Sequence, residues 1–203
     1  MRPSATLLFL TPLALLLAGA TRAPAEVVPW SYNWKPRTGL ILSDRPGTGG
    51  IFLTNQPHQQ AAGAATVIAA YVGAFSSALA NAPDHLTNKG YGLILFLTDD
   101  ASQAKARLTF SGLFNGMLTA TQTQVANTFT GPTSKAVHLG HHWYTVTLSG
   151  YVPPTALKMG KIEANVTVRN NPEPSALVLA VLGSISLGLF LWRVGRGRCR
   201  KAA

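Results

Sequence analysis

The residues best suited to do chemistry in this sequence are three histidines within the stretch HLGHH. Imidazole nitrogens bind zinc and copper, and His138, His141 and His142 offer three of them close together. On one extended strand His138 and His142 would share a face, with His141 opposite, because side chains alternate. No cysteine or nearby carboxylate completes a ligand set. The cluster is therefore a weak candidate for a metal site, and a polar loop is the alternative.

The carboxylates give no stronger indication of catalysis. Asp99-Asp100 would suit a calcium site, yet the acids do not alternate as they do in a calcium-binding loop, and turns favour Asp on their own. Asp44 and Asp84 stand alone in turn-like contexts. The sequence contains no G-x-S-x-G, and the glycine-rich stretch 46–50 lacks the Lys-Ser/Thr ending of a phosphate loop. We therefore predict no catalytic residue and no cofactor, and keep an exported hydrolase or metal-binding protein as a distant alternative.

An aromatic stripe near residue 30 offers a different kind of chemistry. Trp30, Tyr32 and Trp34 alternate with polar residues and would share one face of a strand. Such a face either packs into a core or stacks on sugar rings. The sequence therefore leaves a carbohydrate-binding or adhesive surface open as the alternative to core packing.

Strands must position these side chains, because the apolar residues recur with a period of two. Ile162, Ala164 and Val166 alternate with polar residues, and the segments 106–111 and 143–149 show the same pattern. The continuous apolar run Gly90–Thr98 predicts a central strand buried on both faces. We predict an all-β domain over residues 26–169, an antiparallel β-sandwich of about eight strands, with a jelly roll as one arrangement that fits.

Turn signals separate the expected strands. Asn115-Gly116 predicts a tight hairpin between a strand at 105–112 and one at 117–129. The segment Asp99–Ser102 predicts another hairpin, and Pro153-Pro154 separates the last two strands. Strands are also expected at 40–43, 51–55 and 65–75.

The first 25 residues have the layout of a secretory signal peptide. Arg2 supplies the positive charge, Leu7–Ala18 supplies an apolar stretch too short to span a bilayer comfortably, and Ala23-Pro24-Ala25 fits a cleavage site. We therefore expect export, with signal peptidase as the first processing partner.

The C-terminal end predicts a membrane anchor. Residues 175–192 form an uncharged run that as a helix would be about 27 Å long, close to the thickness of a hydrocarbon core. The basic tail 193–203 follows it, and positive residues remain on the cytoplasmic side. The body is therefore expected outside the inner membrane and the tail inside.

Pro172, Glu173 and Pro174 form a triplet directly before the apolar run, and the arginine-rich terminus follows that run. With these three parts in this order, the segment 170–203 resembles the PEP-CTERM sorting signal of exported bacterial proteins. The resemblance implies that an exosortase-type transpeptidase recognises the triplet, cleaves near it, and passes the body to the cell surface or exterior. It also implies an association with extracellular polysaccharide.

The formal net charge of +10 belongs mostly to the two ends of the chain. Between residues 26 and 171 there are ten basic and six acidic residues, and the basic ones stand singly, with no stripe and no interleaved aromatic residues. We therefore predict no nucleic-acid partner. The only cysteine, Cys199, lies in the tail, so the body contains no disulfide. The sequence as a whole predicts an exported, non-catalytic structural or matrix-associated protein.

Overall fold

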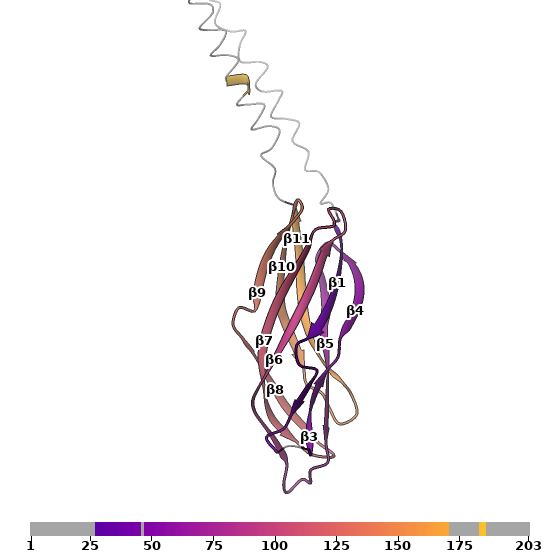
Figure 1. Ribbon diagram of the computed structural model, residues 1–203, viewed down its shortest axis with the longest axis vertical. Helices are drawn as coiled ribbons and strands as arrows, with labels where there is room; N and C mark the ends of the chain where they lie inside the picture. Colours follow the sequence, from indigo (N-terminus) through magenta and orange to yellow (C-terminus); the bar gives the residue numbers. More distant parts are fainter. Residues whose placement is uncertain (1–26, 46, 171–182, 186–203) are drawn as a thin grey trace, which may run out of the picture.

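The computed structural model describes residues 27–45, 47–170 and 183–185, and the first two ranges form one all-β domain. All strand pairs are antiparallel, and two sheets enclose the hydrophobic core (Figure 1). The five-stranded sheet has the order β4 (Gln56–Ala62), β1 (Pro29–Pro36), β6 (Asp84–Asp99), β7 (Lys105–Leu118), β8 (Thr123–Thr130). The six-stranded sheet has the order β2 (Leu40–Leu42), β3 (Gly49–Leu53), β5 (Ala65–Ser76), β11 (Gly160–Asn170), β10 (His142–Val152), β9 (Ser134–Leu139). The predicted all-β, two-sheet antiparallel architecture is confirmed.

The described domain has eleven strands rather than about eight. Strand β4, of sequence QPHQQAA, was not predicted because it is a mostly exposed edge strand that pairs only with β1 and has no apolar alternation. Strand β9 was also missed. Consecutive strands β6-β7-β8 lie side by side in one sheet and β9-β10-β11 in the other, which are meanders rather than the double Greek key of a jelly roll.

The core follows from the alternation along the strands. In β10 and β11 the buried residues are those that the period of two selects, including Tyr144, Val146, Ile162 and Ala164. Strand β6 is central, between β1 and β7, as expected. Its burial on both faces was predicted wrongly, because Phe96 on the outer face is 39% exposed. No layer of the described domain covers that face, so only alternate residues of the apolar run enter the core.

The dipeptide Asn115-Gly116 does not form the predicted hairpin, because it lies inside β7. The pairing of β6 with β7 shifts register opposite it, and the side chain of Asn115 accepts a hydrogen bond from the backbone N–H of Asn88. Gly116 has φ of 149°, and a Cβ there would lie 1.9 Å from the carbonyl oxygen of Gln124. The bulge therefore lies in β6, Gly116 allows a close approach to the backbone of β8, and the actual β7–β8 turn is the segment 119–122.

The start of β1 and the end of β11 lie at the same end of the sandwich. Trp30 pairs with Asp99, the Asp99 carboxylate contacts the His142 ring, and His142 pairs with Asn170. Figure 1 shows both of these strand ends at the top of the long axis. The segments that precede and follow the domain therefore attach to it at one end.

Two predicted regions fall largely outside the described residues. These are the signal peptide, 1–25, and the sorting segment, 170–203, of which only residue 170, at the end of β11, and residues 183–185, as helix, are described. Within the part of the chain that the structure describes, no helix has the length and apolarity needed to cross a membrane.

Candidate functional site

The aromatic stripe of β1 lies inside the domain. Trp30 and Trp34 have no exposed surface, and Tyr32 is buried as well. The ring of Trp30 packs 5.2 Å from Tyr32 and 6.5 Å from Tyr144 of the opposite sheet, and its Nε1 donates to the carbonyl oxygen of Gly63. A buried ring offers no face to a sugar, so the alternative of a carbohydrate platform at Trp30, Tyr32 and Trp34 is wrong. The stripe stabilises the core.

The three histidines lie on a hairpin rather than on one strand. Gly140-His141 is the two-residue turn between β9 and β10, and Gly140, with φ of 59°, fits the first central position of a type II′ turn. His138 faces outward against Trp143, with ring centroids 5.1 Å apart, whereas His142 points toward Asp99. The expectation that His138 and His142 share a face is therefore wrong.

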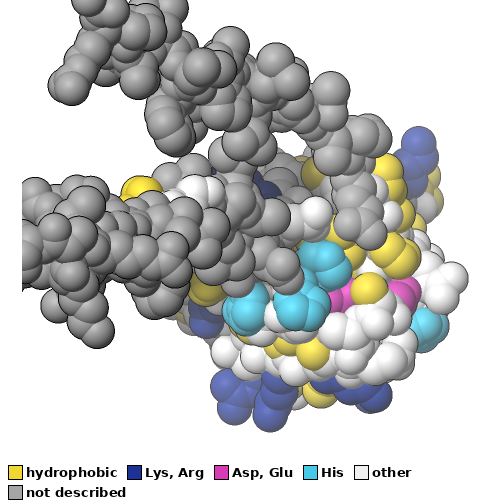
Figure 2. All heavy atoms as spheres, turned by 90° about the horizontal axis from the view of Figure 1, so that it is seen from above, with side chains coloured by type: hydrophobic (Ala, Val, Ile, Leu, Met, Phe, Trp, Pro, Cys, Tyr) yellow, Lys and Arg dark blue, Asp and Glu magenta, His cyan; other side chains and the backbone are white. Residues whose placement is uncertain are grey.

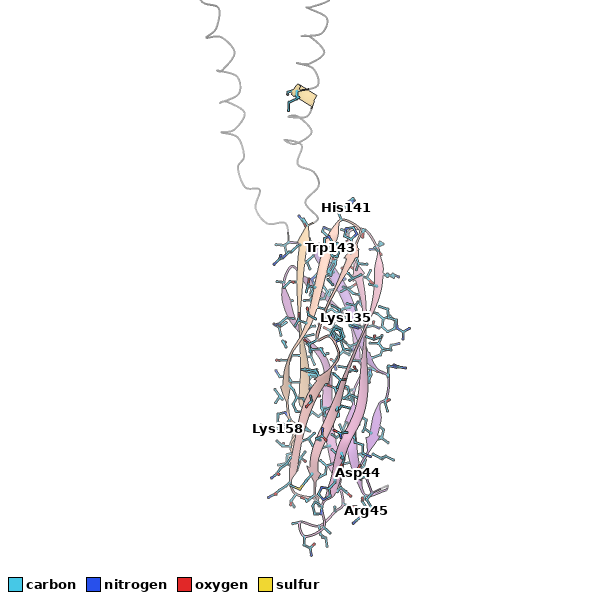
Figure 3. The ribbon with its side chains drawn as sticks, turned by 90° about the vertical axis from the view of Figure 1, so that its left-hand side faces the viewer. Asp44, Arg45, Lys135, His141, Trp143 and Lys158 are labelled. Carbon is cyan, nitrogen blue, oxygen red and sulfur yellow. The ribbon has the colours of Figure 1, made fainter. Side chains whose placement is uncertain are left out.

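Figure 2 views this end of the molecule and shows histidine side chains beside acidic ones, and Figure 3 shows His141 and Trp143 at the same end. Among the described residues, however, no group of three or more His, Cys, Asp and Glu side chains is placed to hold a metal ion. The hairpin thus separates the imidazoles that the sequence puts close together.

Asp99 is the best-connected polar side chain at this end, and it is fully buried. Its carboxylate accepts hydrogen bonds from Nδ1 of His142 at 2.7 Å, from Oγ of Ser102 at 2.9 Å and from the backbone N–H of Ala101 at 3.0 Å. An ionised carboxylate only accepts, so the imidazole carries its proton on Nδ1. The predicted hairpin at 99–102 is confirmed, and its first residue ties the two sheets together.

These contacts determine the charge state of Asp99. Burial raises the pKa of Asp99, but the hydrogen bonds from His142, Ser102 and Ala101 outweigh burial, so the pKa lies below its ordinary value. Burial also raises the pKa of the neighbouring Tyr144, and the negative charges of Asp99 and Asp100 raise it further. The site therefore contains a carboxylate that stays ionised and a phenol that stays neutral.

Strand β6 carries a second buried aspartate at its other end. The carboxylate of Asp84 accepts hydrogen bonds from Oγ of Ser76 at 2.7 Å and from the hydroxyl of Thr48. Thr48 directly precedes β3 and Ser76 is the last residue of β5, and both strands belong to the six-stranded sheet. The hydrogen bonds to Asp84 of β6 therefore also join the two sheets. Gly49 allows the close approach, since a Cβ there would lie 2.5 Å from the carboxylate. Asp84 is therefore a structural tie and not an exposed catalytic acid.

The basic residues of the body, which look isolated in the sequence, converge in the fold. Four exposed cations lie on the two sides of β6. On one side are Lys35 of β1 and Arg37 just after it, and on the other are Lys105 and Arg107 of β7. The exposed ring of Phe96 lies between these strands, with Nζ of Lys35 at 5.8 Å from its centroid. The expectation of no stripe and no interleaved aromatic residue is therefore wrong for this face, which we call the basic face.

The sorting triplet Pro172, Glu173 and Pro174 lies outside the described residues, so its geometry adds nothing to the resemblance. Comparison with known proteins adds no assignment either: the chain matches no family model, no curated protein and no solved structure. The function must therefore be argued from the residues and the geometry given above.

Proposed function

We propose that this chain is an exported, non-catalytic structural protein of the extracellular matrix, processed at its C-terminal PEP signal. Signal peptidase and an exosortase-type transpeptidase are its processing partners. The inner membrane holds the chain transiently, with the domain outside and the C-terminus in the cytoplasm, before the domain reaches the cell surface or the exterior.

The observation that carries this proposal is the position of the two attachment points. Residue 27 follows the proposed signal peptide and residue 170 begins the proposed sorting segment, and β1 and β11 bring both to one end of the sandwich. A domain that is exported and then released from a membrane is attached to the membrane through its terminal segments. The arrangement supports such a tether, because neither segment has to pass along the domain to reach the bilayer.

The shape of the domain supports a structural role. Its longest strand, β6, has 16 residues, which at about 3.3 Å per residue corresponds to ~50 Å. The strands run along the long axis of the molecule (Figure 1). An elongated sandwich held at one end extends away from the cell surface, as a matrix component must.

The carboxylates of the described domain support the absence of catalysis, because each already has a protein partner. A general acid or base has to reach its substrate, whereas Asp84 and Asp99 are buried. The partners are Thr87 and Lys89 for Asp44, Thr48 and Ser76 for Asp84, Ser102 and His142 for Asp99, Ser31 for Asp100, and Lys161 for Glu163.

The test is the substitution Glu173→Ala in the full chain, expressed in the native host. Glu173 supplies the only charge in the triplet Pro172-Glu173-Pro174 that a processing enzyme can recognise. We expect the variant to remain full-length in the membrane fraction. Mass spectrometry of the wild-type secreted form should show new ends near residue 25 and near the triplet.

The control is Asn171→Ala, which changes a polar residue immediately outside the triplet and should leave processing at the wild-type level. Normal size and location of the Glu173→Ala protein would contradict the sorting mechanism. Equal retention of both variants would also contradict it, since it would show a general sensitivity of the segment.

A further inference from the structure

The basic face presents an ordered set of positive charges. Neighbouring strands lie about 4.8 Å apart, so residues on β1 and β7, with β6 between them, are about 10 Å apart across the sheet. In the register, Lys35 aligns with Thr109, and Arg107 lies opposite Phe96. A Cβ at Gly92 would lie 2.8 Å from Cδ of Arg37, so the aliphatic part of Arg37 lies across this glycine on the outer side of β6.

The cations of the basic face are not neutralised by ion pairs within the described residues. Among the described residues, none of Lys35, Arg37, Lys105 and Arg107 takes part in an ion pair. Among the described carboxylates, Asp84 and Asp99 are buried and Glu163 lies in the six-stranded sheet. Asp44 pairs with Lys89, and Asp100, directly after β6, accepts a hydrogen bond from Ser31 of β1. Unpaired positive charge on one face of a sheet attracts anionic ligands.

A cleft of about 540 Å³ opens beside these charges, and its lining is polar. Arg37 lies on its border together with Lys135, whose Nζ is 5.5 Å from the ring centroid of Phe110. Gly90 leaves its backbone exposed, and the hydroxyls of Thr38, Thr109, Ser111 and Thr130 also line the cleft, together with Tyr91 and the apolar Phe110 and Leu113. No carboxylate is among the lining residues. Two cations with several hydroxyls match a ligand that carries both negative charges and hydroxyl groups.

We propose that the basic face and this cleft bind a linear polysaccharide that carries carboxylate groups. The hydroxyls and the exposed backbone at Gly90 hydrogen-bond sugar hydroxyls, the cations pair with carboxylates, and the exposed ring of Phe96 packs on the apolar side of one sugar. A single-stranded nucleic acid fits less well, because its binding sites stack successive bases on several aromatic side chains, and this face exposes one. This inference rests on the proposed matrix role and names its ligand class.

The binding assay uses the full chain purified in detergent, with alginate as the anionic probe and neutral dextran as the reference. The variant Lys35→Thr, Arg37→Thr, Arg107→Thr removes three charges from the basic face with a residue suited to strands. We expect its Kd for alginate at low salt to rise by about tenfold or more, with a weaker dependence of affinity on salt concentration. Dextran should bind weakly to both proteins.

A matched triple, Arg45→Thr, Lys158→Thr, Arg169→Thr, removes one lysine and two arginines from other surfaces. Arg45 and Lys158 lie toward the opposite end of the sandwich from His141 (Figure 3), and Arg169 is in the other sheet. The basic C-terminal tail is the same in every variant, so differences between the two triples report the sheet face alone. Unchanged thermal unfolding should show that both triples are folded, and Arg107→Thr alone serves as a milder second variant.

Equal loss of alginate binding in the two triples would overturn the inference, because it would show an effect of net charge alone. So would unchanged binding in the basic-face triple, or tighter binding of single-stranded DNA than of alginate. Failure of the proposed function is read separately, from the processing of the Glu173→Ala protein. A chain that is sorted normally but does not bind alginate overturns only the ligand assignment.

Discussion

The two faces of the five-stranded sheet differ in what their residues do, although the same strands supply both. On β1 the inward residues Trp30 and Trp34 are fully buried, while the exposed Lys35 lies directly after them in the sequence. On β7, buried Phe110 alternates with exposed cations such as Arg107 in the same way. The inner face stabilises the fold through burial, and the outer face presents positive charges that form no ion pair with any described residue. Substitutions on the two faces should therefore affect different measurements.

The largest expected effect is on the inner face, at Trp30. Trp30→Ala removes a fully buried ring and leaves a cavity between the sheets, so the free energy of unfolding should fall by about 3–5 kcal/mol. Denaturant unfolding of the full chain in detergent, followed by far-ultraviolet circular dichroism, measures this loss.

The matched change on the outer face of the same strand is Lys35→Ala. It removes an exposed side chain whose only described contact is the ring of Phe96, so the loss should be below about 1 kcal/mol. Comparable losses of unfolding free energy for Trp30→Ala and Lys35→Ala would contradict the distinction between the two faces.

A smaller effect is expected at the polar end of the inner face, at Asp99. Asp99→Asn keeps the shape of the side chain but loses the charge that accepts three hydrogen bonds, so unfolding should become easier by about 2 kcal/mol at neutral pH. Asp100→Asn is the control, because Asp100 is partly exposed and its carboxylate accepts from Ser31 alone among the described hydrogen bonds. A neutral result for Asp99→Asn would show that the tie between the sheets contributes little.

The same substitution should change how stability depends on pH. The pKa of Asp99 is lower in the folded chain than its ordinary value near 3.9, so the folded state prefers the ionised carboxylate. This contribution is present above about pH 4 and is lost as pH falls through the folded pKa. The unfolding midpoint should be measured from about pH 7 down to about pH 2, a range that includes the ordinary pKa of an aspartate. As the pH is lowered, the midpoint should fall more steeply for the wild type than for Asp99→Asn.

The smallest predicted effect compares two tryptophans on the inner face. Nε1 of Trp30 donates to Gly63, whereas Nε1 of Trp34 is buried without a hydrogen-bond partner among the described residues. Phe substitutions remove the same atoms at both sites, but only Trp30→Phe breaks a hydrogen bond. Trp30→Phe should therefore be more destabilising than Trp34→Phe by about 1 kcal/mol in the same unfolding assay. The reverse order would mean that Trp34 has a polar partner in solution.

Much of the fold could be predicted because alternation is a local signal. The buried residues of β10 and β11 follow directly from a period of two, and the turns at Asp99–Ser102 and at Pro153-Pro154 are where their residue types indicate. The edge strand β4 was missed because both of its faces are polar, so its pairing with β1 leaves no pattern in the sequence.

The candidate sites could be predicted less well, because they depend on which strands become neighbours. Lys35 and Arg107 are far apart in the sequence and come to one face only through their shared neighbour β6. The i, i+2 spacing of Lys35 with Arg37 and of Lys105 with Arg107 was the available signal, since it puts each pair on one face of its strand. The histidines show the opposite effect. His138 and His142 are close in the sequence, but the turn at Gly140-His141 puts them on opposite faces of the β9–β10 hairpin.

The sequence by itself determined the alternation of the main strands, because an apolar period of two acts over a few residues. For the two ends it provides the prediction of export and sorting that the Glu173→Ala experiment tests. It also determined the side-chain types that alternate along each strand. The tertiary structure decided which face of β1 became the core, which aspartates tie the sheets, and which cations share a surface. These outcomes depend on register between strands distant in the chain, where burial of Trp30 and Trp34 leaves Lys35 on the opposite, solvent-exposed face.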